Sequence, residues 1–580
     1  MKCSKCGHEN RTGAKFCEEC ATPLARVCPN CGSEVSTTAK FCPECAHPVG
    51  IAPKALAAAP FTSPESYTPK HLAEKILISK NGLEGERKQV TVLFADLKGS
   101  MELLAGRDPE EARKLLDPVL EVMMEAIHRY EGTVNQVMGD GIMALFGAPV
   151  AHEDHAVRAC YAAVRMQRRM NLYADEVQRK GGTPVQIRAG LNSGEVVVRS
   201  IGNDLHMDYT AVGQTTHLAA RLEQIARAGS TLITTETLKL AEGYVQVRPL
   251  GAVPVKGLDQ AIEVYEVTGI GLARSRLQAT AARGLTRFVG RDSEVQQLAF
   301  ALERTAVGHA QIVAIVGEAG VGKSRLAWEF THSHRTHGWL ILESASVSYG
   351  MTTPYLPVME LLKSYFRIQS HDEPREIRDR VAGKLLMLDR ALEPMLSPLF
   401  ALLDVPVTDA TWEALDPSQR RQRTLDAVKR VLLRESQVQP LLLIFEDLHW
   451  IDTETQSLLD GLIESLPTNR VMLLVNYRPE YRHLWGSKTY YRQLKIDPLP
   501  PENVEELLEA LLGTNPGLHP LKRLLIERTE GNPFFLEESV RTLIETFHGN
   551  RPERALLDVA LGQLQSLGGD EGRACPGNLL

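Results

Sequence analysis

The spacing of hydrophobic positions changes several times along the chain, most clearly in the stretch Thr133–Gly147. Period-two patterning before Gly139-Asp140, followed by a second apolar run, predicts a β-hairpin with a two-residue turn. Around this hairpin, helical spacing predicts helices at 109–130, 155–173 and 217–228. Strands are predicted at 89–96, 185–192, 195–199, 231–234, 245–249 and 253–267, with Ser193-Gly194 joining the second to the third. We expect these elements to form an α+β sandwich.

The C-terminal half of the chain shows a different pattern, in which apolar strands alternate with helices. Continuous apolar runs at 311–316, 440–446 and 471–477 are typical of strands buried on both faces of a parallel sheet. A helix is predicted at 325–332, and GNPFFLEE at 531–538 follows a helical region. This order predicts a doubly wound α/β fold with a helical lid.

Length and composition limit the classes of protein that fit. The 580 residues are enough for about four domains. The hydrophobic content of 43% and the formal charge of −7 are ordinary for soluble chains and provide no overall attraction to nucleic acid or anionic membranes. No apolar run approaches the roughly 20 residues of a membrane span, and the N-terminus lacks the apolar stretch of a secretory signal. We therefore expect a cytoplasmic protein with no membrane partner.

Cysteines are concentrated at the N-terminus, where eight of the ten lie within the first 45 residues. They form four CxxC pairs in a repeat with a period of 25 residues, and two such pairs complete a closed tetrahedral site for structural Zn²⁺. Disulfide bonds are the alternative, but a reducing cytoplasm disfavours them. Within this cysteine-rich segment, basic and acidic residues are nearly equal in number, which argues against nucleic-acid binding by the segment. The pattern resembles a double zinc ribbon, with Zn²⁺ ligands Cys3, Cys6, Cys17 and Cys20 in one site and Cys28, Cys31, Cys42 and Cys45 in the other.

Two carboxylates mark the candidate chemistry of the region at 86–268. Asp96 ends an apolar strand and Asp140 lies in the hairpin turn, so both are expected at neighbouring strand ends, where they would form an oxygen-rich site that Mg²⁺ favours. The region contains VTVLFADLKGS, VNQVMGDGIMALFG, IRAGLNSGEVV, YTAVGQTTHLAARLE and VKG in this order. It thereby resembles the catalytic domain of class III adenylate/guanylate cyclases.

This resemblance implies a ferredoxin-like α+β sandwich and a role for each matching residue. Asp96 and Asp140 match the ligands of two Mg²⁺ or Mn²⁺ ions. Arg221 matches the arginine that stabilises the transition state, and Lys256 matches the lysine that meets the triphosphate. In this family the active site forms between two catalytic domains, so one such domain per chain implies a homodimer.

Departures from the family pattern affect substrate choice and rate. His217 stands where the family usually has a ribose-orienting Asn, and Gln136 replaces a purine-selecting Lys whose partner position is Thr210. A Gln side chain can both donate and accept hydrogen bonds, so either ATP or GTP can be the substrate. His217 can replace the hydrogen bond of the Asn or can inactivate the site.

The strand at 311–316 leads into GEAGVGKS at 317–324, a GxxxxGKS sequence between a strand and a helix that predicts a phosphate-binding P-loop. Glu446-Asp447 ends a strand in the manner of a Walker B motif, which holds Mg²⁺ and positions water. From FVGR at 288–291 to GNPFF the region resembles AAA-like ATPases of the STAND signalling class, which act as slow switches, and the resemblance also marks Arg291 and Pro533. The expected ATP-binding residues are Gly317, Gly320, Gly322, Lys323, Ser324, Glu446, Asp447 and Arg478.

The predicted organisation is therefore multidomain. It comprises a double zinc ribbon at 1–47, a linker at 48–85, a cyclase domain at 86–268, a linker at 269–286, a P-loop ATPase domain with a helical lid at 287–545, and a tail at 546–580. Relatives of this architecture usually continue into helical repeats, so a truncated or frame-shifted end is a hypothesis for this tail.

The expected function is that of a signalling cyclase, which makes 3′,5′-cyclic nucleotide and pyrophosphate and is regulated by an ATP-binding switch. A protein partner would bind through the ribbons or the ATPase domain. The alternative is an ATP-dependent regulatory scaffold with a weak or inactive cyclase domain.

Overall fold

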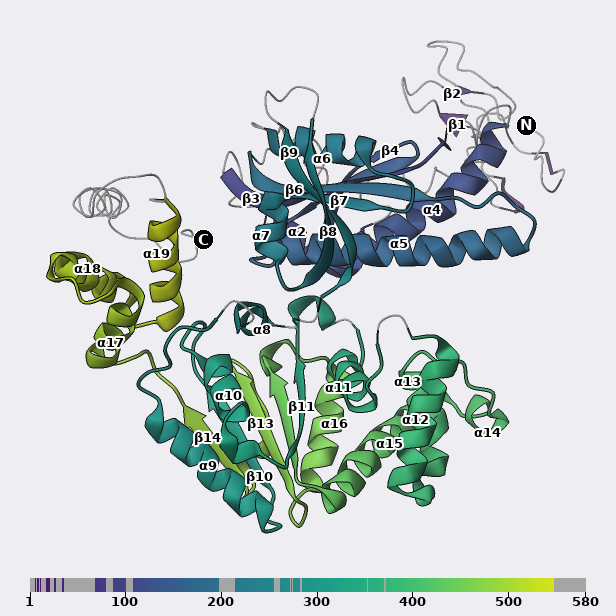
Figure 1. Ribbon diagram of the computed structural model, residues 1–580. Helices are drawn as coiled ribbons and strands as arrows, with labels where there is room; N and C mark the ends of the chain where they lie inside the picture. Colours follow the sequence, from purple (N-terminus) through teal and green to yellow (C-terminus); the bar gives the residue numbers. More distant parts are fainter. Residues whose placement is uncertain are drawn as a thin grey trace.

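The computed structural model describes short pieces of the N-terminus and most of the chain from residue 68 to residue 546 (Figure 1). The described residues are 6, 8–9, 11, 17–20, 26–27, 34–35, 68–79, 87–100, 108–197, 214–254, 261–271, 273, 275–281, 284–351, 353–369 and 372–546. Most of them form two units, which we call the sandwich unit (described residues of 87–270) and the P-loop unit (described residues of 284–546).

A seven-stranded sheet forms the centre of the sandwich unit, with strand order β4-β5-β3-β6-β7-β9-β8. Neighbouring strands run antiparallel except β6 and β7, which are parallel. The strands are β3 (Arg87–Leu97), β4 (Thr133–Met138), β5 (Gly141–Phe146), β6 (Ile187–Val197), β7 (Thr231–Thr234), β8 (Val245–Val253) and β9 (Ile262–Ile270). The helices are α4 (Pro109–Arg129), α5 (His155–Arg179), α6 (Gln214–Ile225) and α7 (Thr235–Ala241).

Successive side chains of β3 point to opposite faces of this sheet. Leu93, Ala95 and Leu97 join the large core formed with α4, α5 and α7. Val90 and Val92 lie in a smaller cluster that includes Ala219 of α6, on the opposite face. The period-two pattern thus buries both faces of the strand, and the predicted α+β sandwich is confirmed.

The predicted turn at Ser193-Gly194 is wrong, because β6 is one continuous strand that pairs with β3 from Ile187 to Val197. The Ser193 hydroxyl is buried in a hydrogen-bond network with Thr91 Oγ1 at 2.8 Å and Thr237 Oγ1 at 3.0 Å. A Cβ atom at position 194 would lie 2.7 Å from Thr215 Oγ1, so Gly194 allows α6 to approach the strand. These turn-forming residue types therefore serve packing and burial.

Other predicted bounds also need correction. The helix predicted at 155–173 extends to Arg179 as α5, and helix α7 was not predicted. In place of a strand at 253–267, β8 continues to Val253 and β9 begins at Ile262.

The P-loop unit contains a five-stranded, all-parallel sheet of order β11-β12-β13-β10-β14, with an apolar core on each face. The predicted doubly wound fold is confirmed. The strands are β10 (Gln311–Val316), β11 (Leu340–Ala345), β12 (Leu441–Glu446), β13 (Val471–Tyr477) and β14 (Tyr491–Lys495). The helices are α9 (Asp292–Ala306), α10 (Lys323–Thr331), α11 (Leu356–Phe366), α12 (Pro374–Leu388), α13 (Leu396–Leu402), α14 (Ala410–Glu413), α15 (Pro417–Val438) and α16 (Thr453–Glu464).

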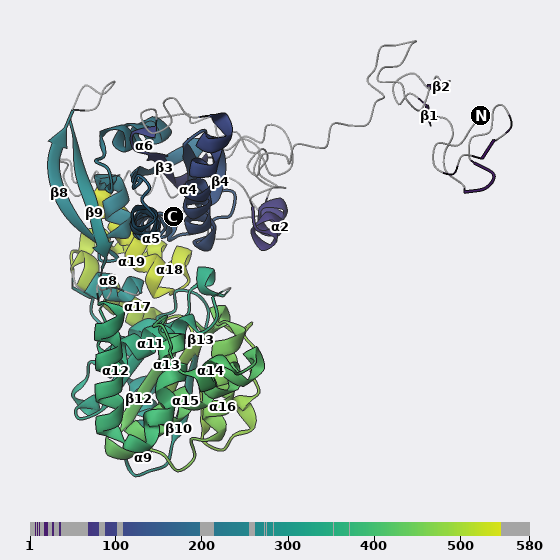
Figure 2. The same ribbon diagram turned by 90° about the vertical axis from the view of Figure 1, so that its right-hand side faces the viewer.

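Three further helices form the predicted lid around their own apolar cluster: α17 (Pro501–Leu512), α18 (His519–Thr529) and α19 (Pro533–Thr546). Helix α2 (Lys70–Ser79) precedes the sandwich unit, and α8 (Arg276–Ala281) follows it. Both views place the α5 face of the sandwich unit toward the P-loop unit and α6 on the far side (Figures 1 and 2). Among the described residues, none of the helices has the length and apolar character that crossing a membrane requires.

Candidate active site and nucleotide site

Asp96 lies at the end of β3, and Asp140 lies in the turn just before β5, the strand that pairs with β3. In the register of β3 and β5, Asp96 stands opposite Gly141, the residue that follows Asp140. The amide of Leu97 donates to the carbonyl oxygen of Asp140 at 3.2 Å, which holds the hairpin turn against the end of β3. The turn itself depends on Gly139, whose φ of 69° is in the left-handed region. The predicted turn therefore lies beside the end of the Asp96 strand.

Arg188 of β6 is a site residue that the sequence did not reveal. It stands opposite Asp96 in the β3–β6 pairing and donates to both carboxylate oxygens, from Nε to Oδ1 at 2.7 Å and from Nη2 to Oδ2 at 2.8 Å. Its Nη1 donates to the carbonyl oxygen of Gln224 at 2.7 Å, which ties α6 to the same site. The hydrogen bonds to Asp96 raise the pKa of Arg188. Only the register of the two strands could have indicated this pairing.

Glu223 of α6 adds a third carboxylate, which was also missed. Its side chain is buried, and its Oε1 lies 2.8 Å from Nε of Arg188. Burial, and after it the hydrogen bond and charge of Asp96, raise the pKa of Glu223 to about 7. The three carboxyl groups provide hard oxygen donors of the kind that a divalent cation such as Mg²⁺ takes, with Asp96 and Asp140 as the residues that would hold it.

Helix α6 approaches the sheet closely and carries two further candidates. A Cβ atom at Gly190 would lie 2.2 Å from the amide of Glu223, so only glycine fits at this point of β6. Arg221 is half-buried, and its Nη1 donates to Gln224 Oε1 at 2.6 Å. His217, one helical turn before Arg221, is exposed. The structure thus brings Asp96, Asp140 and Glu223 together, whereas Arg221 and His217 are on another face of α6.

The remaining cyclase candidates are less informative. Gln136 is exposed on β4, two residues before the end of the strand. Thr210 and Lys256 lie outside the described residues.

The P-loop wraps around its own lysine. Nζ of Lys323 donates to the carbonyl oxygens of Gly317 at 2.8 Å and Glu318 at 2.7 Å, and burial lowers its pKa. Gly320 and Gly322 have φ values of 79° and 98°, which let the loop turn before α10 begins. The N-terminus of α10 and its lysine thus form a site suited to phosphate.

The Walker B acids lie beside this loop. Asn476 of β13 donates to Glu446 Oε2 at 3.2 Å, and its Oδ1 accepts from the amide of Asp447 at 2.8 Å. The Ser324 hydroxyl also hydrogen-bonds Glu446, whose pKa is nevertheless raised by burial. Burial, and then the charge of Glu446, raise the pKa of Asp447 to about 6. Arg478 lies over the ring of Trp450, 5.5 Å from its centroid. Ser324 of the P-loop and the acid pair of β12 therefore lie together at one place in the P-loop unit.

The lid touches the P-loop directly. Asn532 Nδ2 donates to the carbonyl oxygen of Ala319 at 2.9 Å, and the amide of Phe534 donates to Gly320 O at 3.3 Å. Pro533 begins α19, between these two contacts. Arg291 is buried, and its Nη2 donates to the carbonyl oxygens of Val321 and Asp497. Arg291 therefore connects the P-loop to the segment that follows β14.

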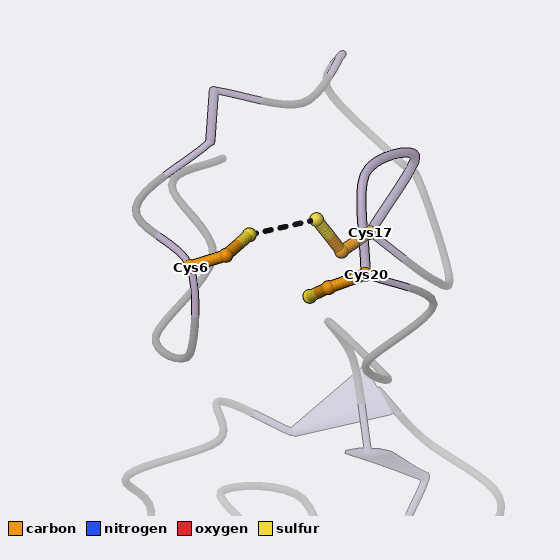
Figure 3. A group of neighbouring side chains, drawn as sticks. All are labelled: Cys6, Cys17 and Cys20. Atoms are coloured by element: carbon orange, nitrogen blue, oxygen red, sulfur yellow. Dashed lines mark hydrogen bonds between the residues drawn. The ribbon is translucent and has the colours of Figure 1, made fainter.

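Three of the predicted zinc ligands are described and lie together. The Sγ atoms of Cys6, Cys17 and Cys20 all lie within 4.8 Å of one another (Figure 3). The Sγ atoms of Cys6 and Cys17 are 3.5 Å apart, which is well beyond the roughly 2 Å of a disulfide bond. Cys3 and the four cysteines of the second site lie outside the described residues.

Three parts of the chain match known protein families. Residues 3–46 match the double zinc ribbon, residues 84–269 the adenylate and guanylate cyclase catalytic domain, and residues 287–475 the AAA ATPase domain. The chain therefore carries a double zinc ribbon, a class III cyclase catalytic domain and an AAA-type ATPase domain in this order, and the predicted kinds and order of domains are confirmed. In these terms the sandwich unit is the cyclase domain and the P-loop unit contains the ATPase domain.

Individual relatives match parts of the chain of different length. The chain is 33% identical over 221 residues to Adenylate cyclase 1 of Rhizobium meliloti (strain 1021). This match covers 37% of this chain and 33% of that protein. It is 25% identical over 465 residues to an uncharacterized protein of the same organism. This second match covers 78% of this chain and 44% of that protein. It is also similar to the solved adenylyl cyclase CyaB from P. aeruginosa, with 33% identity, a TM-score of 0.30 and coverage of 33% of this chain and 98% of that one. The chain spans less than half the length of the two curated relatives.

Proposed function

We propose that this chain is a signalling nucleotide cyclase that converts ATP, or alternatively GTP, into 3′,5′-cyclic nucleotide and pyrophosphate. The observation that supports this most directly is the meeting of Asp96 and Asp140 at adjacent strand ends, with Glu223 beside them. ATP is the first candidate because the cyclase region is 33% identical over 221 residues to a relative named Adenylate cyclase 1.

Each site residue has a distinct task in this proposal. Mg²⁺ or Mn²⁺ ions held by Asp96 and Asp140 would acidify the ribose 3′-hydroxyl and neutralise the leaving pyrophosphate. Lys256 would meet the triphosphate, and Gln136 and Thr210 would hydrogen-bond the purine. His217 would orient the ribose. No protein nucleophile is needed, because the substrate's own 3′-oxygen attacks the α-phosphorus in line.

Arg221 would act on the active site of a second copy of the chain. Positions 221 and 223 are separated by about 200° around a helix of 3.6 residues per turn, so they point to opposite sides. Glu223 faces Asp96, and Arg221 consequently points away from its own carboxylate cluster. A homodimer would allow Arg221 of one copy to stabilise the transition state at the Asp96 site of the other.

The other two domains would regulate and connect this enzyme. We propose that ATP binds with Gly317, Gly320, Gly322 and Lys323 around its phosphates, with Ser324, Glu446 and Asp447 at Mg²⁺ and with Arg478 sensing the γ-phosphate. Slow hydrolysis would then reset a switch. Two Zn²⁺ ions in the ribbons would stabilise a surface for a protein partner, and metal analysis should find about two zinc ions per chain.

The deciding experiment is mass spectrometry of the products formed from ATP or GTP with Mg²⁺ or Mn²⁺. We expect a cyclic nucleotide from wild type and at least a hundredfold less from Asp96→Asn or Asp140→Asn, because each loses a metal ligand. Asp117→Asn is the matched control, since Asp117 lies on α4 and pairs with Arg113 on the helix surface.

Absence of product from wild type with either nucleotide and either metal would contradict the proposal. Slow ATP hydrolysis that is lost in Lys323→Ala would then support the alternative, an ATP-dependent scaffold with an inactive cyclase domain.

A further inference from the structure

A loop of the P-loop unit inserts an aromatic side chain into the cyclase domain. Tyr349 follows β11 and packs against the core formed by α4 and α5. Its ring centroid lies 5.2 Å from that of Tyr130 and 4.9 Å from the guanidinium carbon of Arg158. Ser348 accepts a hydrogen bond from Nη2 of the same arginine. In Figure 1 the P-loop unit faces the side of the cyclase domain that carries α5, and α6 lies on the far side.

Arg158 connects this contact to a buried acid of the cyclase domain. Only 2% of Arg158 is exposed, and its Nη1 donates to Glu131 Oε2 at 2.8 Å. Glu131 also pairs with Lys75 of α2 and has a φ of 58°, in the left-handed region that side chains seldom adopt. The ion pairs hold this strained residue in place, because an unpaired buried carboxylate would be costly.

Glu131 in turn precedes the catalytic hairpin. Gly132 follows it, and a Cβ atom there would lie 2.5 Å from the ring of Phe146, so the entry to β4 is tightly packed. The strand begins at Thr133 and leads to Gln136 and the turn at Asp140. A shift of Glu131 therefore moves the hairpin that carries one of the two proposed metal ligands.

The other end of the loop is bonded to the Walker B strand. The amide of Ser346 donates to the carbonyl oxygen of Glu446 at 2.9 Å, and Ala345 is paired with Glu446 in the sheet. Only two residues separate Ser346 from Tyr349. This backbone hydrogen bond would pass a change in β12 on binding of Mg²⁺–ATP to the loop.

We propose that Ser348 and Tyr349 form the docking contact through which nucleotide at the P-loop sets the position of the catalytic hairpin, with Arg158 and Glu131 as positioning residues. This inference rests on the proposed function, because it assigns the surface by which the ATPase domain regulates the cyclase. The two domains then form an allosteric pair whose coupling depends on this contact.

Hydrogen exchange of the full-length chain, followed by mass spectrometry, tests this without requiring cyclase activity. In wild type and in Tyr349→Phe, which keeps the ring, Mg²⁺ with a non-hydrolysable ATP analogue should slow exchange of the segment 131–146 by about threefold or more. In Tyr349→Ala, and in Lys323→Ala, which removes a phosphate contact at the P-loop, the analogue should leave this exchange unchanged. The Lys323→Ala arm also separates binding at the P-loop from binding at the cyclase site.

A second measurement uses cyclase kinetics. Tyr349→Ala and Ser348→Ala should lower kcat/KM by about threefold or more, because displacement of the hairpin moves both Asp140, a proposed metal ligand, and Gln136, a proposed purine contact. Ser348→Ala removes only the hydroxyl contact to Arg158, so it reports on coupling even if the larger truncation unfolds the chain.

Three results would overturn the inference. They are unchanged exchange of the segment 131–146 when the analogue binds wild type, an exchange response that persists in Tyr349→Ala, and an exchange response that persists in Lys323→Ala. If wild type makes no cyclic nucleotide but the exchange response depends on Tyr349, the proposed function fails and the docking contact stands.

Discussion

At the scale of single residues, the candidate active site is organised by charge pairing. Arg188 engages both oxygens of Asp96 and also lies beside Glu223 and the backbone of α6. Removal of a partner from a partly buried ion pair leaves an uncompensated charge, whereas an exposed pair contributes little. Arg188 therefore both stabilises the fold and keeps the acidic cluster together.

Substitution of Arg188 by methionine should affect stability and catalysis together. We expect Arg188→Met to lower the free energy of unfolding by about 1–3 kcal/mol, because Asp96 and Glu223 then repel each other without a cation between them. Urea unfolding and the product assay measure the two effects. Arg248→Met is the matched control, since the Arg248 side chain is largely exposed in its ion pair with Glu266. This substitution should change the free energy of unfolding by less than about 0.5 kcal/mol.

His155 should make the cyclase domain sensitive to mild acid. It is buried, Thr91 Oγ1 lies 2.8 Å from its Nδ1, and burial lowers its pKa from 6.5 to about 4. Between these two values the unfolded chain binds a proton that the folded chain does not, so stability is fully present above pH 6.5 and falls as the pH drops toward 4. About 2 kcal/mol should be lost between pH 7.5 and pH 5.

Denaturant unfolding at these two pH values checks this expectation. His155→Gln should show a smaller loss of stability than wild type, because glutamine does not titrate. His334→Gln, at an exposed position, should behave as wild type. An equal loss in wild type and His155→Gln would assign the acid sensitivity to other groups.

At the scale of elements, close contact between β6 and α6 positions the acidic cluster. Gly190 and Gly194 are the two points at which β6 has no room for a side chain, and α6 lies against both. This contact places Glu223 next to Arg188 and turns Arg221 outward. The position of the helix depends most on Gly190, because a Cβ atom there would meet the backbone of α6, whereas at Gly194 it would meet the side chain of Thr215.

Gly190→Ala should therefore abolish cyclase activity and destabilise the cyclase domain by about 3 kcal/mol or more, because the new methyl group meets the backbone of α6. Cyclic-nucleotide formation and thermal unfolding would show this. Gly269→Ala on β9 is the control, since the nearest atom to its Cβ is Gln246 Oε1 at 3.6 Å. Wild-type behaviour of Gly190→Ala would mean that α6 can shift without consequence.

At the scale of the whole molecule, α5 and α6 lie on opposite sides of the cyclase domain. The α5 side contacts Tyr349 of the P-loop unit, whereas α6, with Arg221, is on the side away from it. A second copy of the chain could therefore approach α6 without displacing the ATPase domain. Regulation and catalysis would use opposite faces of one sheet.

A complementation experiment tests this arrangement. Asp96→Ala and Arg221→Ala should each be inactive alone. An equal mixture should recover about a quarter of the wild-type activity, because half of the dimers are mixed and each contains one intact site. No recovery, together with activity of Arg221→Ala alone, would show that Arg221 is not supplied in trans.

Much of the local structure could be predicted from the sequence. The strands β7, β10 and β13 have the predicted bounds, and the hairpin predicted at 133–147 ends one residue earlier, at Phe146. Period-two patterning and turn residues act over a few neighbouring positions, so they can be recognised in the sequence. The turn expected at Ser193-Gly194 was wrong because burial beside Thr91 and α6 outweighed the local preference of these residues.

The sequence by itself determined the kinds of domains, their order and the identity of the metal-binding candidates, since these depend on residue types at fixed spacing. Only the tertiary structure decided that Arg188 and Glu223 join Asp96, that Arg221 points away from it, and that Tyr349 reaches Arg158 across 190 intervening positions. Strand register, helix rotation and domain docking depend on contacts between residues distant in the chain, and no local pattern encodes those contacts.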